Sequence, residues 1–155
     1  MMTMQDDWSV DFEYAVICMT EAENGQDVYV GDRSGNFFCF EQATGTLKAR
    51  MRLVAGTVRS IVCFKGKVYA CGAMGRIGEW DAETFHKGPE RCTPEGEDIY
   101  SCCVTTLGES DIMWVGDEAG GRNPNPNPAL CLPLLTIAGA LAGWHHPQHR
   151  PFGGL

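Results

Sequence analysis

The sequence lacks the short motifs by which common enzyme classes are recognised. It contains no GxSxG, HExxH, GxGxxG or P-loop pattern, so it offers no nucleophile elbow, zinc-protease helix or phosphate-binding glycine loop. His86 is the one histidine before residue 122, and Cys92 follows it closely, but nothing in the sequence orients the two side chains for catalysis. We therefore expect a protein that is not an enzyme, with no catalytic residues and no cofactor.

The sequence also lacks any CxxC pair, although it contains 8 cysteines. This absence excludes the spacing of a zinc knuckle or a thioredoxin-type redox couple. Six of the cysteines lie in apolar, strand-like runs, where a reduced thiol behaves as a small hydrophobic side chain; they are Cys18, Cys39, Cys63, Cys71, Cys102 and Cys103. The N-terminal stretch MMTMQDDWSV has no basic-then-apolar order of a signal peptide. A reducing, cytoplasmic location is expected.

Basic residues are scarce, since 12 Lys and Arg face 20 Asp and Glu and leave a net charge of -8. This charge repels the phosphates of nucleic acids and the anionic surface of a membrane, so neither is an expected partner. A membrane span is not expected either. The apolar run ALCLPLLTIAGALAGW (129–144) is shorter than the roughly 20 residues that a spanning helix needs.

What the sequence does contain is a repeat. VYVGDRSGNFFCFEQATG (28–45) and VYACGAMGRIGEWDAETF (68–85) align at a constant offset of 40 residues without a gap. A third copy begins as MWVGDEAGG (113–121), at an offset of 85 from the first. A period of about 40 to 45 residues is that of one blade of a β-propeller.

Each copy has the composition of strands joined by tight turns, because β-branched and aromatic residues alternate and glycines punctuate them. Three first strands are expected, at 14–19, 57–64 and 100–106, each followed by a second strand in DVYVG, KVYACG and DIMWVG. Gly35, Gly75 and Gly120 supply the turns into the third strands, since a tight hairpin needs a residue that tolerates positive φ.

The segment TLKARMRL (46–53) alternates between apolar and basic residues. This period of two predicts an outer strand that is solvated on one face. The residues expected on its buried face are Leu47, Ala49, Met51 and Leu53, and those on its wet face are Lys48, Arg50 and Arg52.

The copies resemble the blades of WD-repeat propellers, whose third strand often ends in Trp-Asp, as Trp80 and Asp81 do in GEWDAET. The resemblance spans roughly residues 10–121, although the Gly-His pair of that family is absent and Phe40-Glu41 replaces Trp-Asp in the first copy. The first copy is also similar to the repeats of quinoprotein-like propellers, with its Val-Tyr-Val-Gly opening and Ala-x-Thr-Gly ending. The two subfamilies remain alternatives.

The expected fold class is all-β, an incomplete β-propeller of about two and a half four-stranded antiparallel blades at 10–53, 57–95 and 98–121. The resemblance implies a non-catalytic scaffold whose blade-top loops bind other proteins or peptides. Self-association through open blade edges is a further expectation. Because similar runs occur in propellers fused to inositol-phosphate phosphatases, the alternative is a regulatory inositol-phosphate-binding segment of a phosphoinositide phosphatase.

The organisation changes after residue 121. The stretch RNPNPNP (122–128) is a Pro/Asn spacer that forbids a helix or a paired strand, and no acidic residue follows it. We divide the chain into a partial propeller at 1–121 and an irregular or short-helical tail at 122–155, whose apolar run would pack on an exposed blade edge. Three explanations are open: a truncated or mis-spliced product of a larger protein, a ring completed by other chains, or an open stack capped by its own tail.

A basic stripe is the first candidate binding site, formed by Lys48, Arg50 and Arg52 and joined by Arg59. It would grip an acidic peptide or an inositol phosphate, although such a stripe is more often a wet strand face. Trp8 precedes the repeats and is the candidate interface anchor. Four other aromatic residues are expected in the core between blades: Phe37, Phe40, Trp80 and Trp114.

Metal binding has two weak candidates. His145, His146 and His149 cluster in the tail, but Pro147 spoils a shared helical face, so no metal is expected. The sequence GDRSGN (31–36) offers oxygens at alternate positions as a calcium loop does, but its glycine comes one place early and no distal glutamate follows. We expect turn chemistry there instead.

Overall fold

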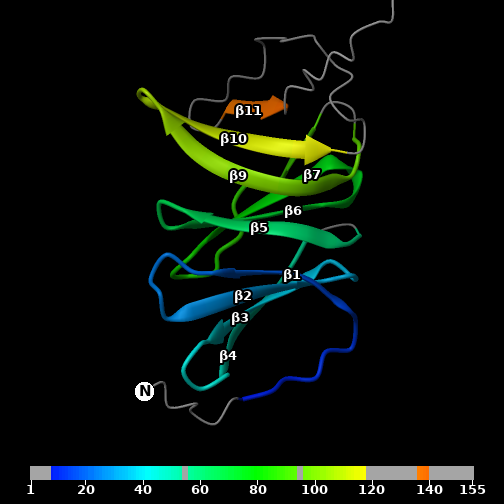
Figure 1. Cartoon of the computed structure of the whole chain (residues 1–155), viewed down its shortest axis with the longest axis vertical. Coiled ribbons are helices and arrows are strands. Elements are labelled where there is room, and N and C mark those ends of the chain that lie inside the picture. The colour runs from blue at the N-terminus through cyan, green and yellow to red at the C-terminus, as the bar shows by residue number, and fades with distance from the viewer. Residues whose placement is uncertain (1–7, 54–55, 94–95, 118–135, 140–155) are drawn as a thin grey trace, which may run out of the picture.

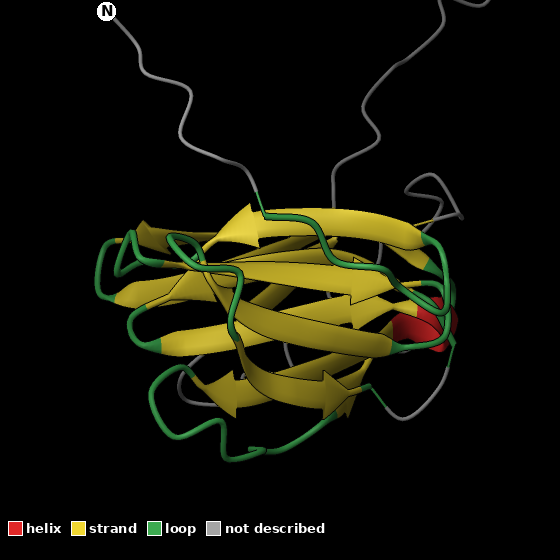
Figure 2. Ribbon diagram, turned by 90° about the horizontal axis from the view of Figure 1, so that it is seen from below, coloured by secondary structure: helices red, strands yellow, loops and turns green. Residues whose placement is uncertain are grey.

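The protein is a stack of β-sheets. The computed structural model describes residues 8–53, 56–93, 96–117 and 136–139. These residues form three sheets and one short 3-10 turn. In Figure 1 the first strands of the sheets, β1 (Val16–Glu21), β5 (Val58–Phe64) and β9 (Ile99–Leu107), lie one above another. Figure 2, seen from below, shows the strands in yellow and the one short 3-10 turn in red at one side of the molecule.

Blade 1 is a four-stranded antiparallel meander in the order β1-β2-β3-β4. Its remaining strands are β2 (Asp27–Asp32), β3 (Asn36–Glu41) and β4 (Leu47–Arg52). Blade 2 repeats this order as β5-β6-β7-β8, with β6 (Lys67–Gly72), the 3-10 turn η1 (Ala73–Gly75), β7 (Arg76–Asp81) and the short β8 (Arg91–Cys92). The expectation of two complete four-stranded blades is confirmed.

Blade 3 contains β9 and β10 (Ser110–Asp117), which pair antiparallel as expected, and β11 (Thr136–Gly139). β11 pairs with β10 in parallel, so the sheet order is β11-β10-β9. The tail was expected to be irregular or to form a short helix, and its described residues form this strand instead. The expected turn at Gly120 and the predicted boundary between 121 and 122 lie outside the described residues.

The three blades share one local irregularity, which shows that their hairpins have a common geometry. The pairing of each first strand with its second strand shifts register once, and the extra residue is Ile17 in β1, Arg59 in β5 and Tyr100 in β9. In each blade, the extra residue comes directly after the first residue of the first strand that pairs with the second strand. A bulge of this kind bends a strand and redirects one side chain. The repeat is therefore structural as well as sequential.

The core lies between the blades, in two apolar clusters. The cluster between blades 1 and 2 includes Tyr29, Phe37 and Trp80. The cluster between blades 2 and 3 is made of Tyr69, Cys71, Ile77, Ile99, Met113 and Val115. Both clusters are formed where one sheet lies against the next, as expected for propeller blades.

Two of the four aromatic residues expected between blades lie elsewhere. Phe40 is buried, but its ring packs against Trp8 and Phe12 of the N-terminal segment, with centroids 5.9 Å away in both cases. Trp114 alternates with Met113 and Val115, which face blade 2, and so points to the opposite face of blade 3, where it is half-buried. Alternation along a strand puts neighbouring residues on opposite faces.

The alternation predicted for the outer strand holds only in part. Met51 and Leu53 are buried, but Leu47 is 51% exposed. The register of β3 with β4 shifts between Cys39 and Phe40, which leaves Lys48 as an extra residue on β4. This bulge moves Leu47 to the outer face, so the expectation for Leu47 is wrong. The period-two pattern, which predicted a buried Leu47, cannot reveal a bulge.

The turn glycines are placed as expected where the structure describes them. Gly35 has φ 89° and Gly75 has φ 65°, both in the region that other residues avoid. Asp32 precedes Gly35 and accepts hydrogen bonds from the backbone N–H of Ser34 (2.8 Å) and Asn36 (2.9 Å). Turn chemistry at GDRSGN is therefore confirmed.

Candidate functional site

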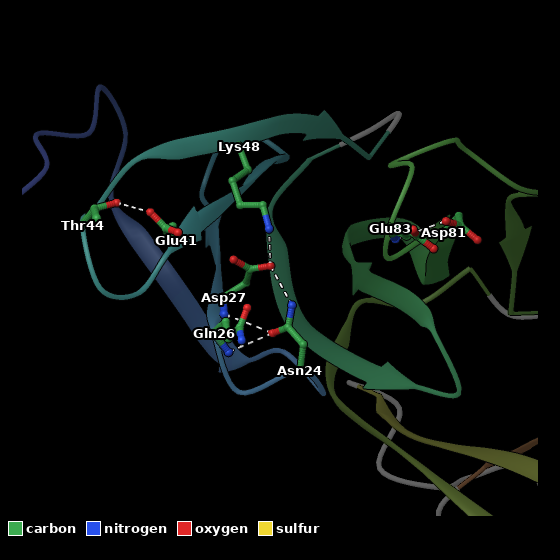
Figure 3. Close-up of polar contacts among 8 residues, drawn as sticks. All are labelled: Asn24, Gln26, Asp27, Glu41, Thr44, Lys48, Asp81 and Glu83. Carbon is green, nitrogen blue, oxygen red and sulfur yellow. Dashed lines mark hydrogen bonds and ion pairs between the residues drawn. The ribbon is translucent and has the colours of Figure 1, made fainter.

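The candidate site is a cleft of about 530 Å³ between blades 1 and 2, on the side of the stack where the β1–β2 and β5–β6 turns lie. Its walls come from the β1–β2 and β5–β6 turns, from β4, and from the end of β7. Seven charged side chains line it: Glu23, Asp27, Asp81, Glu83, Lys48, Lys65 and Lys67. Loops carried by rigid sheets are typical places for binding residues. Figure 3 shows the polar contacts around Asp27 and Asp81.

Asp27 is the most buried charge in the cleft, at 3% exposure. Its Oδ2 accepts hydrogen bonds from Lys48 Nζ (2.6 Å) and from Asn24 Nδ2 (2.8 Å). Burial raises the pKa of this carboxyl, but the hydrogen bonds from Lys48 and Asn24 outweigh burial and leave the pKa below its usual value. Oδ1 of Asp27 has no hydrogen-bond partner among the described residues.

The turn that carries Asp27 is held by Asn24. Asn24 Oδ1 accepts from the backbone N–H of Gln26 (2.9 Å) and of Asp27 (3.1 Å). Asn favours such turns because its side chain can bond backbone groups two or three residues ahead. The single side chain of Asn24 therefore fixes both the turn and the carboxylate beside it.

Asp81 holds the turn that follows β7, as Asn24 holds the β1–β2 turn. Its Oδ1 accepts from the backbone N–H of Thr84 (2.9 Å), from the Thr84 hydroxyl (2.9 Å) and from the backbone N–H of Glu83 (3.1 Å). These bonds, with the backbone bond of Thr84 the largest cause, lower the pKa of Asp81 to about 2. In blade 1 the carboxylate of Glu41 accepts from Thr44 in the same way, 40 residues earlier.

On this side of the stack, polar contacts join all three blades. The carboxylate of Glu23 in blade 1 accepts from the backbone N–H of Lys65 (2.9 Å) and of Gly66 (2.7 Å) in blade 2. Lys65 Nζ in turn donates to Asp111 in blade 3, at 2.7 and 2.8 Å from its two oxygens. The cleft is therefore built from turns that are tied to one another.

The opposite side of the stack, where β5 and β9 begin, also has polar contacts between blades. Asp98 accepts from Arg59 Nη2 (2.8 Å) and from the backbone N–H of Met74 (2.9 Å). The guanidinium of Arg59 lies over the ring of Tyr100, 4.5 Å from its centroid. Arg59 and Tyr100 are the bulge residues of blades 2 and 3, so their contact follows from the shared bulge.

The structure does not gather the predicted basic stripe. Lys48 is the bulge residue of β4 and turns to Asp27, whereas Arg50 lies over the ring of Phe38 on the other face of blade 1, at 5.6 Å. Arg52 is exposed at the end of β4. Arg59 belongs to blade 2 and pairs with Asp98. Of the four, only Lys48 lines the cleft.

Trp8, the predicted interface anchor, is 38% exposed. Its Nε1 donates to the carbonyl of Gln42 (2.7 Å), and its ring lies beside Phe40 and closes over Gly45. Part of its surface therefore covers blade 1, and its part in an interface stays a prediction. His145, His146 and His149 lie outside the described residues.

The residues that sequence reasoning missed are those that build the cleft, above all Glu23, Asn24 and Asp27. The stretch ENGQD (23–27) is recognisable as a turn, because Asn and Gly are turn residues. Nothing in the sequence indicates that Asp27 is buried, since its partner Lys48 lies two strands away. A register shift brings the two together, and the sequence pattern does not show that shift.

In the described residues no three His, Cys, Asp or Glu side chains are arranged to hold a metal ion. Within the same residues, no helix has the length and apolar character to cross a membrane.

Comparison with known proteins supports the fold. No protein-family profile matches the chain, and no curated protein does. Among solved structures, the chain is similar to the β-propeller domain of Cps50 (Swd1) from Myceliophteria thermophila, with a TM-score of 0.54 and 10% sequence identity. The match covers 68% of this chain and 40% of that one, so the chain spans less than half the length of the propeller domain it resembles. The likeness shows the fold: this is a β-propeller chain with an incomplete set of blades.

Proposed function

We propose that the chain is a non-catalytic, protein-binding propeller segment of the WD-repeat type, which works in the cytoplasm. Three features support the proposal: the stacked blades, the Trp80-Asp81 ending of a third strand, and the likeness to a propeller domain of known structure. Propellers offer rigid blades that hold loops in fixed positions. The function then depends on which loop surface binds.

The observation that carries the proposal is the cleft between blades 1 and 2. Its charged side chains come from two blades and are fixed by hydrogen bonds to turns, so a partner segment meets a surface that needs little ordering. Pre-ordered polar groups of this kind give specificity in protein recognition.

The charges of the cleft favour a basic partner segment. Four carboxylates line it. Lys48 and Lys67 pair with Asp27 and Asp81, and Lys65 pairs with Asp111 of blade 3, so Glu23 and Glu83 are the cleft carboxylates without an ion pair among the described residues. The whole chain carries a net charge of -8, which attracts cationic partners at long range. The proposed partner is therefore a protein segment that carries Arg or Lys.

The experiment uses the full chain and two fluorescent Gly-Ser peptides, one with two arginines and one with two glutamates in the same places. Fluorescence anisotropy should show that the arginine peptide binds, that salt weakens it, and that the glutamate peptide does not bind. The Glu83→Lys variant should lose affinity about tenfold, which corresponds to about 1.4 kcal/mol. Glu83 is exposed and lines the cleft.

Glu109→Lys is the matched control, since Glu109 is exposed on the β9–β10 turn and makes the same change in net charge. It should bind the arginine peptide as the wild type does. A folded chain that binds neither peptide contradicts the proposal, and so does an equal loss of affinity in the two variants.

The alternative of an inositol-phosphate-binding segment gains no support from the described residues. A polyphosphate needs several cations around one point. Lys48 and Arg59 are each paired with a carboxylate, and Arg50 lies on the other face of blade 1. Inositol hexakisphosphate is accordingly titrated into the chain alone in a calorimeter, and we expect no binding.

A further inference from the structure

Each blade presents one face to the next blade through an aromatic residue on its second strand. Tyr29 on β2 is buried against blade 2, and Tyr69 on β6 is buried against blade 3. Trp114 on β10 occupies the same repeat position, 85 residues after Tyr29. Among the described residues no further blade lies on that face. We call the face that carries Tyr29, Tyr69 or Trp114 the presenting face of its blade. The presenting faces of blades 1 and 2 are covered by the next blade, whereas no described blade covers that of blade 3.

Each blade also has a receiving face, which is illustrated by Ile61. Ile61 pairs with Ala70 in blade 2, is 7% exposed, and packs against blade 1. Met19 pairs with Val30 in blade 1, which stands 40 residues before Ala70, so Met19 is the equivalent of Ile61. Met19 is 66% exposed. The receiving face of blade 1 is open at β1.

The outer part of the receiving face is already covered. In blade 2, Trp80 reaches back to Phe37 of blade 1, with ring centroids 4.5 Å apart. Its equivalent Phe40 contacts Trp8 and Phe12, so the N-terminal segment takes the place that a preceding blade would take along β3. In Figure 1 this segment runs below blade 1 before it enters β1. What remains open is the half of the face formed by β1.

We propose that blade 3 of one copy packs on the open half of blade 1 of a second copy, head to tail. The occupant is a second copy because the equivalent faces within the chain are covered by blades of this chain, through the same repeat positions. Blade 3 carries the presenting residues and blade 1 the receiving residues of one and the same type of interface. This association is independent of the cleft and of the proposed function.

The two surfaces differ, so the interface is heterologous. An interface of this kind closes into a ring when the rotation allows it and otherwise grows into a chain, and it does not stop at a two-fold dimer. Apolar side chains such as Met19 of blade 1 and the half-buried Trp114 of blade 3 supply the driving force, since burying apolar surface is the main favourable contribution to association.

The first test measures mass by light scattering on size exclusion with the full chain, under reducing conditions, over a range of concentrations. The wild type should rise above the 17.0 kDa of one chain as concentration increases. Met19→Glu should stay at the mass of one chain. Met74→Glu is the control, because Met74 is 55% exposed on η1, away from the face, and should assemble as the wild type does.

The second test distinguishes head-to-tail packing from other contacts. Cys103 is exposed and pairs with Trp114 across β9 and β10, so it lies on the presenting face. Cys103→Glu alone should be a single copy. A mixture of Met19→Glu and Cys103→Glu should form a complex of two copies, because the first retains an intact blade 3 and the second an intact blade 1.

Three results would overturn the proposal: a wild type that keeps the mass of one chain at every concentration, a Met19→Glu variant that assembles like the wild type, and a mixture that fails to form the complex. Circular dichroism of each variant shows that it is folded. Failure of this test leaves the peptide-binding test of the cleft untouched, since the cleft lies within one copy.

Discussion

The ring of Trp80 meets the ring of Phe37 edge to face, with centroids 4.5 Å apart and planes at 77°. Trp80 belongs to β7 of blade 2 and Phe37 to β3 of blade 1, and both side chains are almost fully buried. Edge-to-face pairs contribute about 0.5–1.5 kcal/mol beyond the area they bury. This pair joins two sheets that have no hydrogen-bonded strand in common.

Trp80→Ala should therefore destabilise the chain by about 3–5 kcal/mol, because it leaves a cavity between blades 1 and 2. Urea unfolding followed by circular dichroism measures the loss. Trp8→Ala serves as the matched control and should cost less than half as much, since Trp8 is partly exposed. Equal losses for the two variants would contradict the place given to Trp80.

A methyl group at Gly31 should also separate the blades. A Cβ there would lie 2.7 Å from Cys18 Sγ and 2.7 Å from a methyl of Val58, which belongs to blade 2. We expect Gly31→Ala to cost about 1–3 kcal/mol in free energy of unfolding, as overpacking does. Gly88→Ala is the control, because its Cβ would meet only the flexible side chain of Glu79. Unchanged stability in Gly31→Ala would show that the blades are further apart than described.

The contact of Glu23 with blade 2 can be tested on its own. Its carboxylate accepts two backbone N–H groups from the β5–β6 turn. Glu23→Ala should lower the free energy of unfolding by about 0.5–1.5 kcal/mol, as expected for lost hydrogen bonds. Glu109→Ala removes an exposed carboxylate on another turn and should have almost no effect. Thermal unfolding distinguishes the two outcomes, and equal shifts would argue against this contact.

Acid should weaken the fold through Asp81. The folded pKa of Asp81 is lowered to about 2, whereas the unfolded chain has an ordinary value near 3.9. The ionised carboxylate thus stabilises the fold fully above about pH 4, and this stabilisation is lost as pH falls towards 2. Asp81→Asn should flatten the fall in stability between these pH values. An unchanged pH profile in the variant would show that the hydrogen bonds to Thr84 and Glu83 are not made in solution.

Much of the fold could be predicted from the sequence because a repeat fixes several elements at once. Aligning Val28 with Val68 and Met113 places three second strands, and the turn glycines Gly35 and Gly75 follow from the need for positive φ. Apolar residues on both faces of these strands indicated that sheets lie on either side. Local sequence patterns therefore predict the stacking of the blades.

The candidate site could not be predicted in the same way, because it depends on register and on contacts between distant residues. The bulge at Lys48 divides the basic stripe and sends Lys48 to Asp27, and no local pattern signals a bulge at that residue. The N-terminal segment covers Phe40 through Phe12 and Trp8, which precede the first aligned copy at 28–45. The parallel pairing of β11 with β10 likewise joins segments that share no sequence pattern.

The contact between Phe37 and Trp80 exists only if the equivalent antiparallel sheets of blades 1 and 2 lie face to face, and nuclear magnetic resonance can detect it in solution. In the full-length labelled chain, nuclear Overhauser effects should join the ring protons of Phe37 to the indole protons of Trp80, since their centroids are 4.5 Å apart. If these effects are absent from the spectrum of a folded sample in which both rings are assigned, the two sheets do not pack as propeller blades.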